Sequence, residues 1–164
     1  MKPSRPFVVS ATARLQAPPH RVYETIANYH SGHPRILPKA FSNLTVERGG
    51  IGAGTTIRFD VRMLGTTTHF RAEVTEPEPG RVLVETNVAG SNSVSTFIVE
   101  PGATPGESVV TISTEFPPRP GIAAAIERFV SARVLPKLYR EELRLLEAAA
   151  AGPAGTAAPA TSRA

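Results

Sequence analysis

The chain has 164 residues, of which 41% are hydrophobic and 20% charged, and its formal net charge is +4 at pH 7. This length and composition are typical of one globular domain with a substantial hydrophobic core. The absence of cysteine excludes disulfide bonds, thiolate nucleophiles and cysteine-ligated metal sites. No segment approaches the ~20 apolar residues of a membrane-spanning helix, and the first residues do not form a signal peptide. We therefore expect a soluble, cytoplasmic protein without stable membrane insertion.

The positive charge is spread along the chain and does not indicate binding to nucleic acid. Arginines alternate with apolar residues in segments such as 55–64, as they do on the solvent-facing side of a sheet. A surface that follows a phosphate backbone usually gathers basic side chains on one face, with aromatic residues between them. We therefore expect no nucleic-acid partner and a charge that mainly affects solubility.

The first predicted elements are a strand and two short helical segments. Residues 7–15 alternate between apolar and polar with period two, which predicts a half-buried strand. Prolines in 17–19 end that strand and suit the first turn of a short helix, whose apolar face would consist of Val22, Ile26 and Tyr29. Glycine and proline interrupt residues 30–38, which predicts a second helical turn within a loop.

Six further segments alternate with period two and are separated by turns rich in glycine and proline. The predicted strands are 43–48, 55–64, 68–74, 82–88, 93–100 and 108–116. Such alternation is typical of an antiparallel sheet with one solvent-exposed face. In the fourth of these strands, the residues expected to face inward are Val82, Val84, Thr86 and Val88.

A long helix is predicted over residues 120–150. Its expected apolar stripe consists of Ile122, Ile126, Phe129, Val130, Val134 and Leu138. Pro136 lacks a backbone donor, so we expect the helix to bend there. Residues 151–164 are rich in alanine, glycine and proline and have no periodicity, which predicts a disordered tail after a single domain of residues 1–150.

Three short motifs accompany this order of elements. Residues 15–23, LQAPPHRVY, resemble the opening of the START-like, or Bet v 1-like, superfamily (SRPBCC), where a strand ends and a helix starts with proline. Residues 52–59 are similar to its Gly-x-Gly-Thr entry into the third strand, and residues 133–143 resemble the closing helix of its polyketide cyclase/dehydrase and lipid-transport branch. The resemblance covers residues 7–148.

The resemblance implies an α+β helix-grip fold. A curved seven-stranded antiparallel sheet would wrap around the long C-terminal helix, with two short helices between strands 1 and 2. The cavity of such a fold would bind a small hydrophobic ligand such as a lipid, a polyketide or an isoprenoid-like compound. Because one fold hosts many functions, two alternatives stay open: a polyketide cyclase/aromatase-type enzyme, and a protein-interaction module with a collapsed cavity.

Apolar side chains on the expected inner face are, as a set, the candidate walls of that cavity, although ordinary core packing is the better explanation for most of them taken singly. The candidate wall residues are Phe59, Val61, Phe70, Ile112, Ile126, Phe129 and Val130. The candidate polar contacts at the mouth are Tyr23, His33 and Arg35. Hydroxyl groups that could orient a ligand from the inner face belong to Thr68, Thr86, Thr96 and Thr114.

No residue is assigned a catalytic role from the sequence. His30 and His33 fit solvated loop histidines, ligand contacts or an acid–base group. Their His-x-x-His spacing lacks a third or fourth metal ligand, so we expect no metal and no cofactor. The strand carboxylates are expected to face solvent, where neither burial nor a close partner would tune their pKa values; these are Asp60, Glu73, Glu85 and Glu115.

Overall fold

Seven strands form one antiparallel sheet in the computed structural model, which describes residues 5–152. The strand order is β1-β7-β6-β5-β4-β3-β2. The elements follow the chain as β1 (Phe7–Leu15), α1 (Pro19–Ala27), the 3-10 helix η1 (His33–Arg35), β2 (Phe41–Arg48), β3 (Thr56–Met63), β4 (Thr66–Glu78), β5 (Val82–Asn87), β6 (Val94–Pro101), β7 (Ser108–Phe116) and α2 (Ile122–Ala151). Residues 153–164 of the predicted tail lie outside the described residues.

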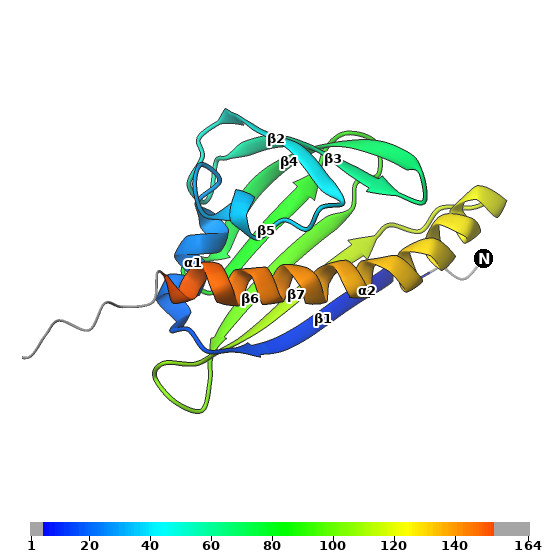
Figure 1. Ribbon diagram of the computed structural model, residues 1–164. Helices are drawn as coiled ribbons and strands as arrows, with labels where there is room; N and C mark the ends of the chain where they lie inside the picture. The colour runs from blue at the N-terminus through cyan, green and yellow to red at the C-terminus, as the bar shows by residue number, and fades with distance from the viewer. Residues whose placement is uncertain (1–4, 153–164) are drawn as a thin grey trace, which may run out of the picture.

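The sheet curves around α2, which lies across its concave face (Figure 1). Strand β1 pairs with β7, so the start of the chain lies beside the last strand, and α2 packs against β1 and α1. The predicted α+β helix-grip fold is confirmed, including α1 and η1 between the first two strands. Among residues 5–152, no helix is both long enough and apolar enough to span a membrane.

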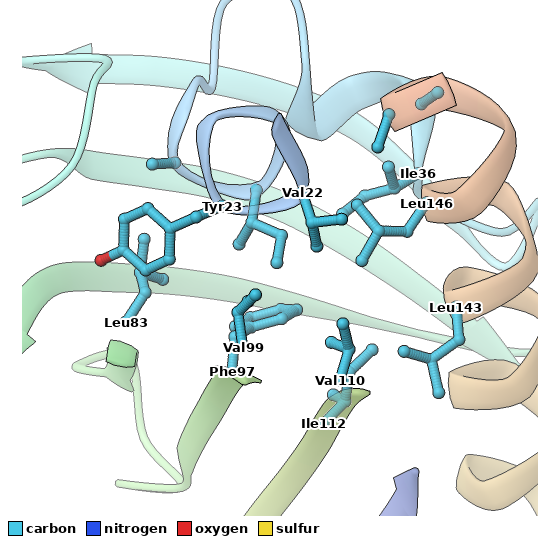
Figure 2. Close-up of a cluster of buried hydrophobic side chains, with 14 of the residues drawn as sticks. Val22, Tyr23, Ile36, Leu83, Phe97, Val99, Val110, Ile112, Leu143 and Leu146 are labelled. Carbon is cyan, nitrogen blue, oxygen red and sulfur yellow. The ribbon is translucent and has the colours of Figure 1, made fainter. Parts of the chain in front are cut away.

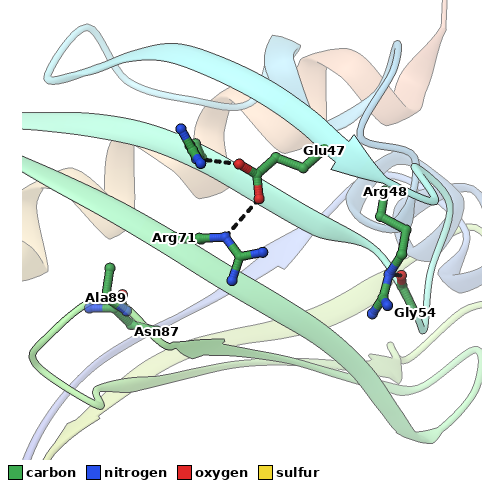
Figure 3. A network of polar contacts seen from close by, with 7 residues as sticks. Glu47, Arg48, Gly54, Arg71, Asn87 and Ala89 are labelled. Atoms are coloured by element: carbon green, nitrogen blue, oxygen red, sulfur yellow. Dashed lines mark hydrogen bonds and ion pairs between the residues drawn. The ribbon is translucent and has the colours of Figure 1, made fainter.

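The hydrophobic core lies between α1, the C-terminal half of α2 and the middle of the sheet (Figure 2). Period-two alternation in β3, β4 and β7 places the predicted apolar residues inward. The side chains that form this core include Val22, Ile36, Leu83, Phe97, Val99, Val110, Ile112, Leu143 and Leu146. The opposite face of the sheet is charged, as its arginines predicted: Glu47 on β2 forms ion pairs with Arg58 on β3 and Arg71 on β4 (Figure 3).

Strand β5 faces the core with the opposite set of residues from the predicted one. Its buried residues are Leu83, Glu85 and Asn87, whereas Val82, Val84 and Thr86 are half-exposed and Val88 is exposed. The expectation that Glu85 faces solvent is therefore wrong. Valine is common on solvent-facing strand positions because its branched side chain suits the extended backbone. The valines of β5 at positions 82 and 84 therefore lie on the outer face, although the sequence pattern assigned them to the inner one. A one-residue change of phase moves every side chain of a strand to the other face.

The predicted apolar stripe of α2 is wrong in its N-terminal half. Ile122, Ile126 and Phe129 are 82%, 59% and 61% exposed. The face turned toward the sheet instead carries Ser131, Leu135, Tyr139 and Glu142. This half of α2 borders a cavity, so its inner face need not be apolar throughout. Figure 1 shows that the helix is bent along its length, and Pro136 lies inside it.

Candidate functional site

A cavity of ≈ 450 Å³ lies between α2 and the concave face of the sheet. Four of the predicted wall residues line it: Phe59, Val61, Phe70 and Ile112. The other three, Ile126, Phe129 and Val130, lie outside its lining because α2 turns a different face inward. Of the four threonines, Thr68 and Thr114 line the cavity, whereas Thr86 and Thr96 lie on the opposite side of their strands.

One side of the cavity is aromatic and aliphatic, and we call it the apolar wall. The rings of Phe59 and Phe70, on neighbouring strands, stack with their centroids 5.2 Å apart and their planes 8° apart. Phe41 on β2 extends this row, with its centroid 6.0 Å from that of Phe59. Leu44, Val61 and Met63 complete the apolar wall. Because cross-strand aromatic pairs stabilise a sheet, these rings support β2–β4 as well as the cavity.

The cavity has a closed end, which is buried, and an open end. The closed end consists of His33, Glu85, Phe97, Tyr139 and Glu142, each of which is at most 8% exposed. The open end consists of the exposed residues Ala89, Gly90, Arg119 and Glu127, in the turn after β5 and around the start of α2. Arg119 spans this end by donating a hydrogen bond from Nη2 to the carbonyl of Gly90 at 2.7 Å.

A tight turn after α1 carries two aromatic rings into the closed end. The carbonyl of Asn28 accepts hydrogen bonds from the backbone N–H groups of Gly32 and His33, at 3.0 and 2.7 Å. A Cβ atom on Gly32 would lie 2.3 Å from the carbonyl oxygen of Thr25, so this turn packs against α1 only with glycine. The rings of Tyr29 and His33 then stack with their centroids 4.4 Å apart.

His33 is buried, at 3% exposure, so the solvated-loop interpretation is wrong for it. Its Nδ1 lies 2.8 Å from the carbonyl oxygen of Ile26. Because a carbonyl oxygen only accepts, Nδ1 carries a proton and donates it, which leaves Nε2 toward the cavity. Nε2 lies 3.6 Å from Oε1 of Glu85. His30 is exposed and fits the solvated interpretation.

Glu85 accepts a short hydrogen bond from the hydroxyl of Tyr29, at 2.6 Å. Burial, followed by the charge of Glu85 and this hydrogen bond, raises the pKa of Tyr29 well above its usual value, so Tyr29 remains a donor. Glu85 is thus held as an acceptor at the closed end.

Glu142 lies beside this pair on α2 and is 3% exposed. Its carboxyl lines the cavity and forms no hydrogen bond with any residue in 5–152. Burial, and then the charge of Glu85, raises the pKa of Glu142 well above its usual value. Three residues earlier on α2, Tyr139 shares a hydrogen bond with Thr114, whose Oγ1 lies 2.8 Å from Oγ of Ser95.

The sequence contained a signal for Glu142 but not for Glu85. Residues 135, 139, 142 and 146 follow helical spacing, and Glu142 interrupts three large side chains on that face. Glu85 lies in a strand where both faces carry apolar residues, so the pattern is ambiguous.

Two of the three predicted polar contacts lie away from the cavity. Tyr23 lies on the buried face of α1, and its hydroxyl donates to Oε1 of Glu76 at 2.7 Å. Arg35 is exposed and does not line the cavity. Only His33 is at the cavity, and it lies at the closed end, not at the mouth.

Tyr29→Phe is expected to lower the free energy of unfolding by about 1–3 kcal/mol, because Glu85 would lose the donor that satisfies its buried oxygen. Urea denaturation measures this change. Tyr23→Phe is the matched control, since it also removes a hydroxyl bonded to a glutamate, but Glu76 is only half-buried and water can replace the donor. Equal losses in the two variants would contradict the assignment of Glu85 to a buried polar site.

Comparison with known proteins gives the following matches. A family model described as polyketide cyclase/dehydrase and lipid transport matches residues 6–151. The KanY protein, solved by NMR, is 25% identical with a TM-score of 0.78 and covers 91% of this chain and 100% of its own. The Zhui aromatase/cyclase from Streptomyces sp. R1128 is 15% identical, with a TM-score of 0.74 and coverage of 90% and 94%. A START superfamily protein from Mycobacterium smegmatis is 19% identical, with a TM-score of 0.56 and coverage of 87% and 92%. No curated protein is significantly similar to the chain.

Proposed function

The chain belongs to the polyketide cyclase/dehydrase and lipid transport family, the branch of the START-like superfamily that its motifs resemble, and on that basis we propose that it binds a small hydrophobic molecule in the cavity under α2. The two unlike ends of the cavity carry this proposal. An aromatic and aliphatic wall leads to a closed end of buried polar groups, which suits an elongated apolar molecule with one polar end.

The size and lining of the cavity support this function. A volume of ≈ 450 Å³ lies within the range of pockets that hold small organic ligands. Burial of a ligand against the stacked rings of Phe59 and Phe70 would contribute about 25 cal/mol per Å² of apolar surface, before the entropic cost of association. A protein-interaction module with a collapsed cavity is less well supported, because the space between α2 and the sheet is open.

A second candidate function is turnover of the ligand in the same cavity. The observation that favours it is the group of acid–base side chains that meet at the closed end: His33, Glu85 and Glu142. Burial raises the pKa of Glu142 there. This candidate predicts that His33→Gln leaves ligand binding in place but abolishes product formation. Pure binding predicts that no product forms even with the parent chain.

Ser131→Trp is expected to weaken binding of the neutral apolar dye N-phenyl-1-naphthylamine by about tenfold or more. Ser131 lines the cavity from α2 and is 4% exposed, so a tryptophan there would fill space that the dye needs. Dye fluorescence measures the affinity, and circular dichroism checks the fold.

Phe129→Trp is the matched control on the same helix. Phe129 is 61% exposed on the face turned away from the cavity, so this variant should bind the dye as the parent does. If Ser131→Trp binds the dye as tightly as the parent, the ligand site is elsewhere and the proposed function fails.

A further inference from the structure

The closed end of the cavity contains a carboxyl group without a partner. Glu142 is 3% exposed and lines the cavity, and no group among residues 5–152 donates a hydrogen bond to it or accepts one from it. No fully buried side-chain oxygen or nitrogen atom among residues 5–152 lacks a partner, so the carboxyl oxygens of Glu142 are open to the space inside the cavity. The carboxyl therefore faces a position that the polar atom of a ligand can occupy when the cavity is filled.

The neighbours of Glu142 determine its charge. The groups that face it are Glu85 from β5, Tyr29 and His33 from the turn after α1, and Tyr139 from its own helix. Among the described residues, Arg119 is the one Lys or Arg in the cavity lining, and it lies at the open end. Two carboxyl groups close together in a buried site do not both ionise. Glu85 has the Tyr29 donor at 2.6 Å and His33 beside it, so Glu142 is the one that keeps a proton.

Most other donors at the closed end are already used. The Tyr29 hydroxyl donates to Glu85, and Nδ1–H of His33 donates to Ile26. Three hydroxyls form a chain with two hydrogen bonds, so one of their three O–H groups remains available; they are those of Ser95, Thr114 and Tyr139. A protonated Glu142, which forms no hydrogen bond with these groups, therefore adds a donor that faces the cavity.

We propose that Glu142 is a hydrogen-bond donor that selects, within the proposed function, ligands whose buried end carries an accepting oxygen. The class is an apolar, largely aromatic molecule with a ketone or phenolic oxygen at the end that enters first. The oxygen accepts from Glu142, and the remaining ring or chain lies along the apolar wall. Glu85 keeps the single negative charge of the site, so a ligand with a carboxylate at this end is rejected.

The test compares two dyes of similar size in the full chain. Prodan carries one ketone on a naphthalene ring, whereas N-phenyl-1-naphthylamine has no oxygen. Glu142→Leu replaces the donor with an apolar side chain of similar size. We expect this variant to bind Prodan about tenfold more weakly than the parent at pH 7, whereas its affinity for N-phenyl-1-naphthylamine should stay within about twofold of the parent's. Glu142→Gln retains an N–H donor and should restore most of the Prodan affinity.

A pH series provides a second readout, which does not depend on whether Glu142→Leu folds. Prodan affinity of the parent should fall as the pH rises and Glu142 loses its proton, whereas that of Glu142→Gln should stay constant, since the amide does not titrate. If Prodan binds the parent and Glu142→Leu equally, or if the pH series of the parent and Glu142→Gln coincide, the inference is wrong and the proposed function stands. If neither dye binds the parent, the proposed function fails as well.

Discussion

Leu146→Ala is expected to lower the free energy of unfolding by about 3 kcal/mol, whereas Ile126→Ala on the same helix should change it by less than about 0.5 kcal/mol. Leu146 is fully buried in the core between α1 and the sheet, so its truncation removes apolar contacts and leaves a cavity (Figure 2). Ile126 is 59% exposed, and alanine is the better helix former. Both variants shorten an aliphatic residue of α2, so the difference reports which face of the helix is buried.

Urea denaturation followed by circular dichroism measures both changes. A loss of more than about 2 kcal/mol in Ile126→Ala would mean that the N-terminal half of α2 packs through the stripe that the sequence predicts. The cavity would then be lined by other residues of α2 than Ser131 and Leu135. The comparison therefore tests the geometry of the site as well as the stability of the fold.

The strands that could be predicted in full are those in which one face is apolar throughout. In β3, residues from Ile57 to Met63 alternate strictly with polar ones, and the inner face is the predicted one. In β5, apolar residues occur on both faces, and the buried set of Leu83, Glu85 and Asn87 includes two polar residues. A period-two pattern identifies a face only when that face packs against apolar groups, and β5 borders the closed end of a cavity.

The sequence pattern failed to predict the polar groups of the site for the same reason. Simple amphipathicity assigns charged residues to solvent, yet Glu142 occupies the inward face of α2, between Tyr139 and Leu146. Its neighbours from other elements, Tyr29 and His33, depend on a turn whose close packing needs Gly32. Contacts that join four distant segments follow from tertiary packing, which local periodicity does not encode. The sequence therefore predicted that a cavity exists but not which groups line its closed end.

Glu142 also gives the protein a distinctive dependence of stability on pH. Burial and the charge of Glu85 raise its pKa in the folded state above the value of the unfolded chain. The folded state therefore binds this proton more tightly than the unfolded state does. The contribution of this proton to the free energy of unfolding is fully present at pH values below the usual glutamate pKa, near 4.5. It falls as the pH rises toward the raised pKa of the folded state. The maximum slope for one proton is about 1.4 kcal/mol per pH unit.

Glu142→Gln removes this titration and leaves a side chain of the same shape. We expect its free energy of unfolding, relative to the parent chain, to increase steadily as the pH is raised from 5 to 8, because only the parent must either keep a proton or bury a charge. Urea denaturation at each pH measures the difference, in which contributions of the other titrating groups largely cancel. Glu141→Gln makes the same change one residue earlier, outside the cavity lining, and should follow the parent. A difference between Glu142→Gln and the parent that is flat across this range would mean that Glu142 ionises as freely in the folded chain as in the unfolded one, and the closed end would then lack its proton donor.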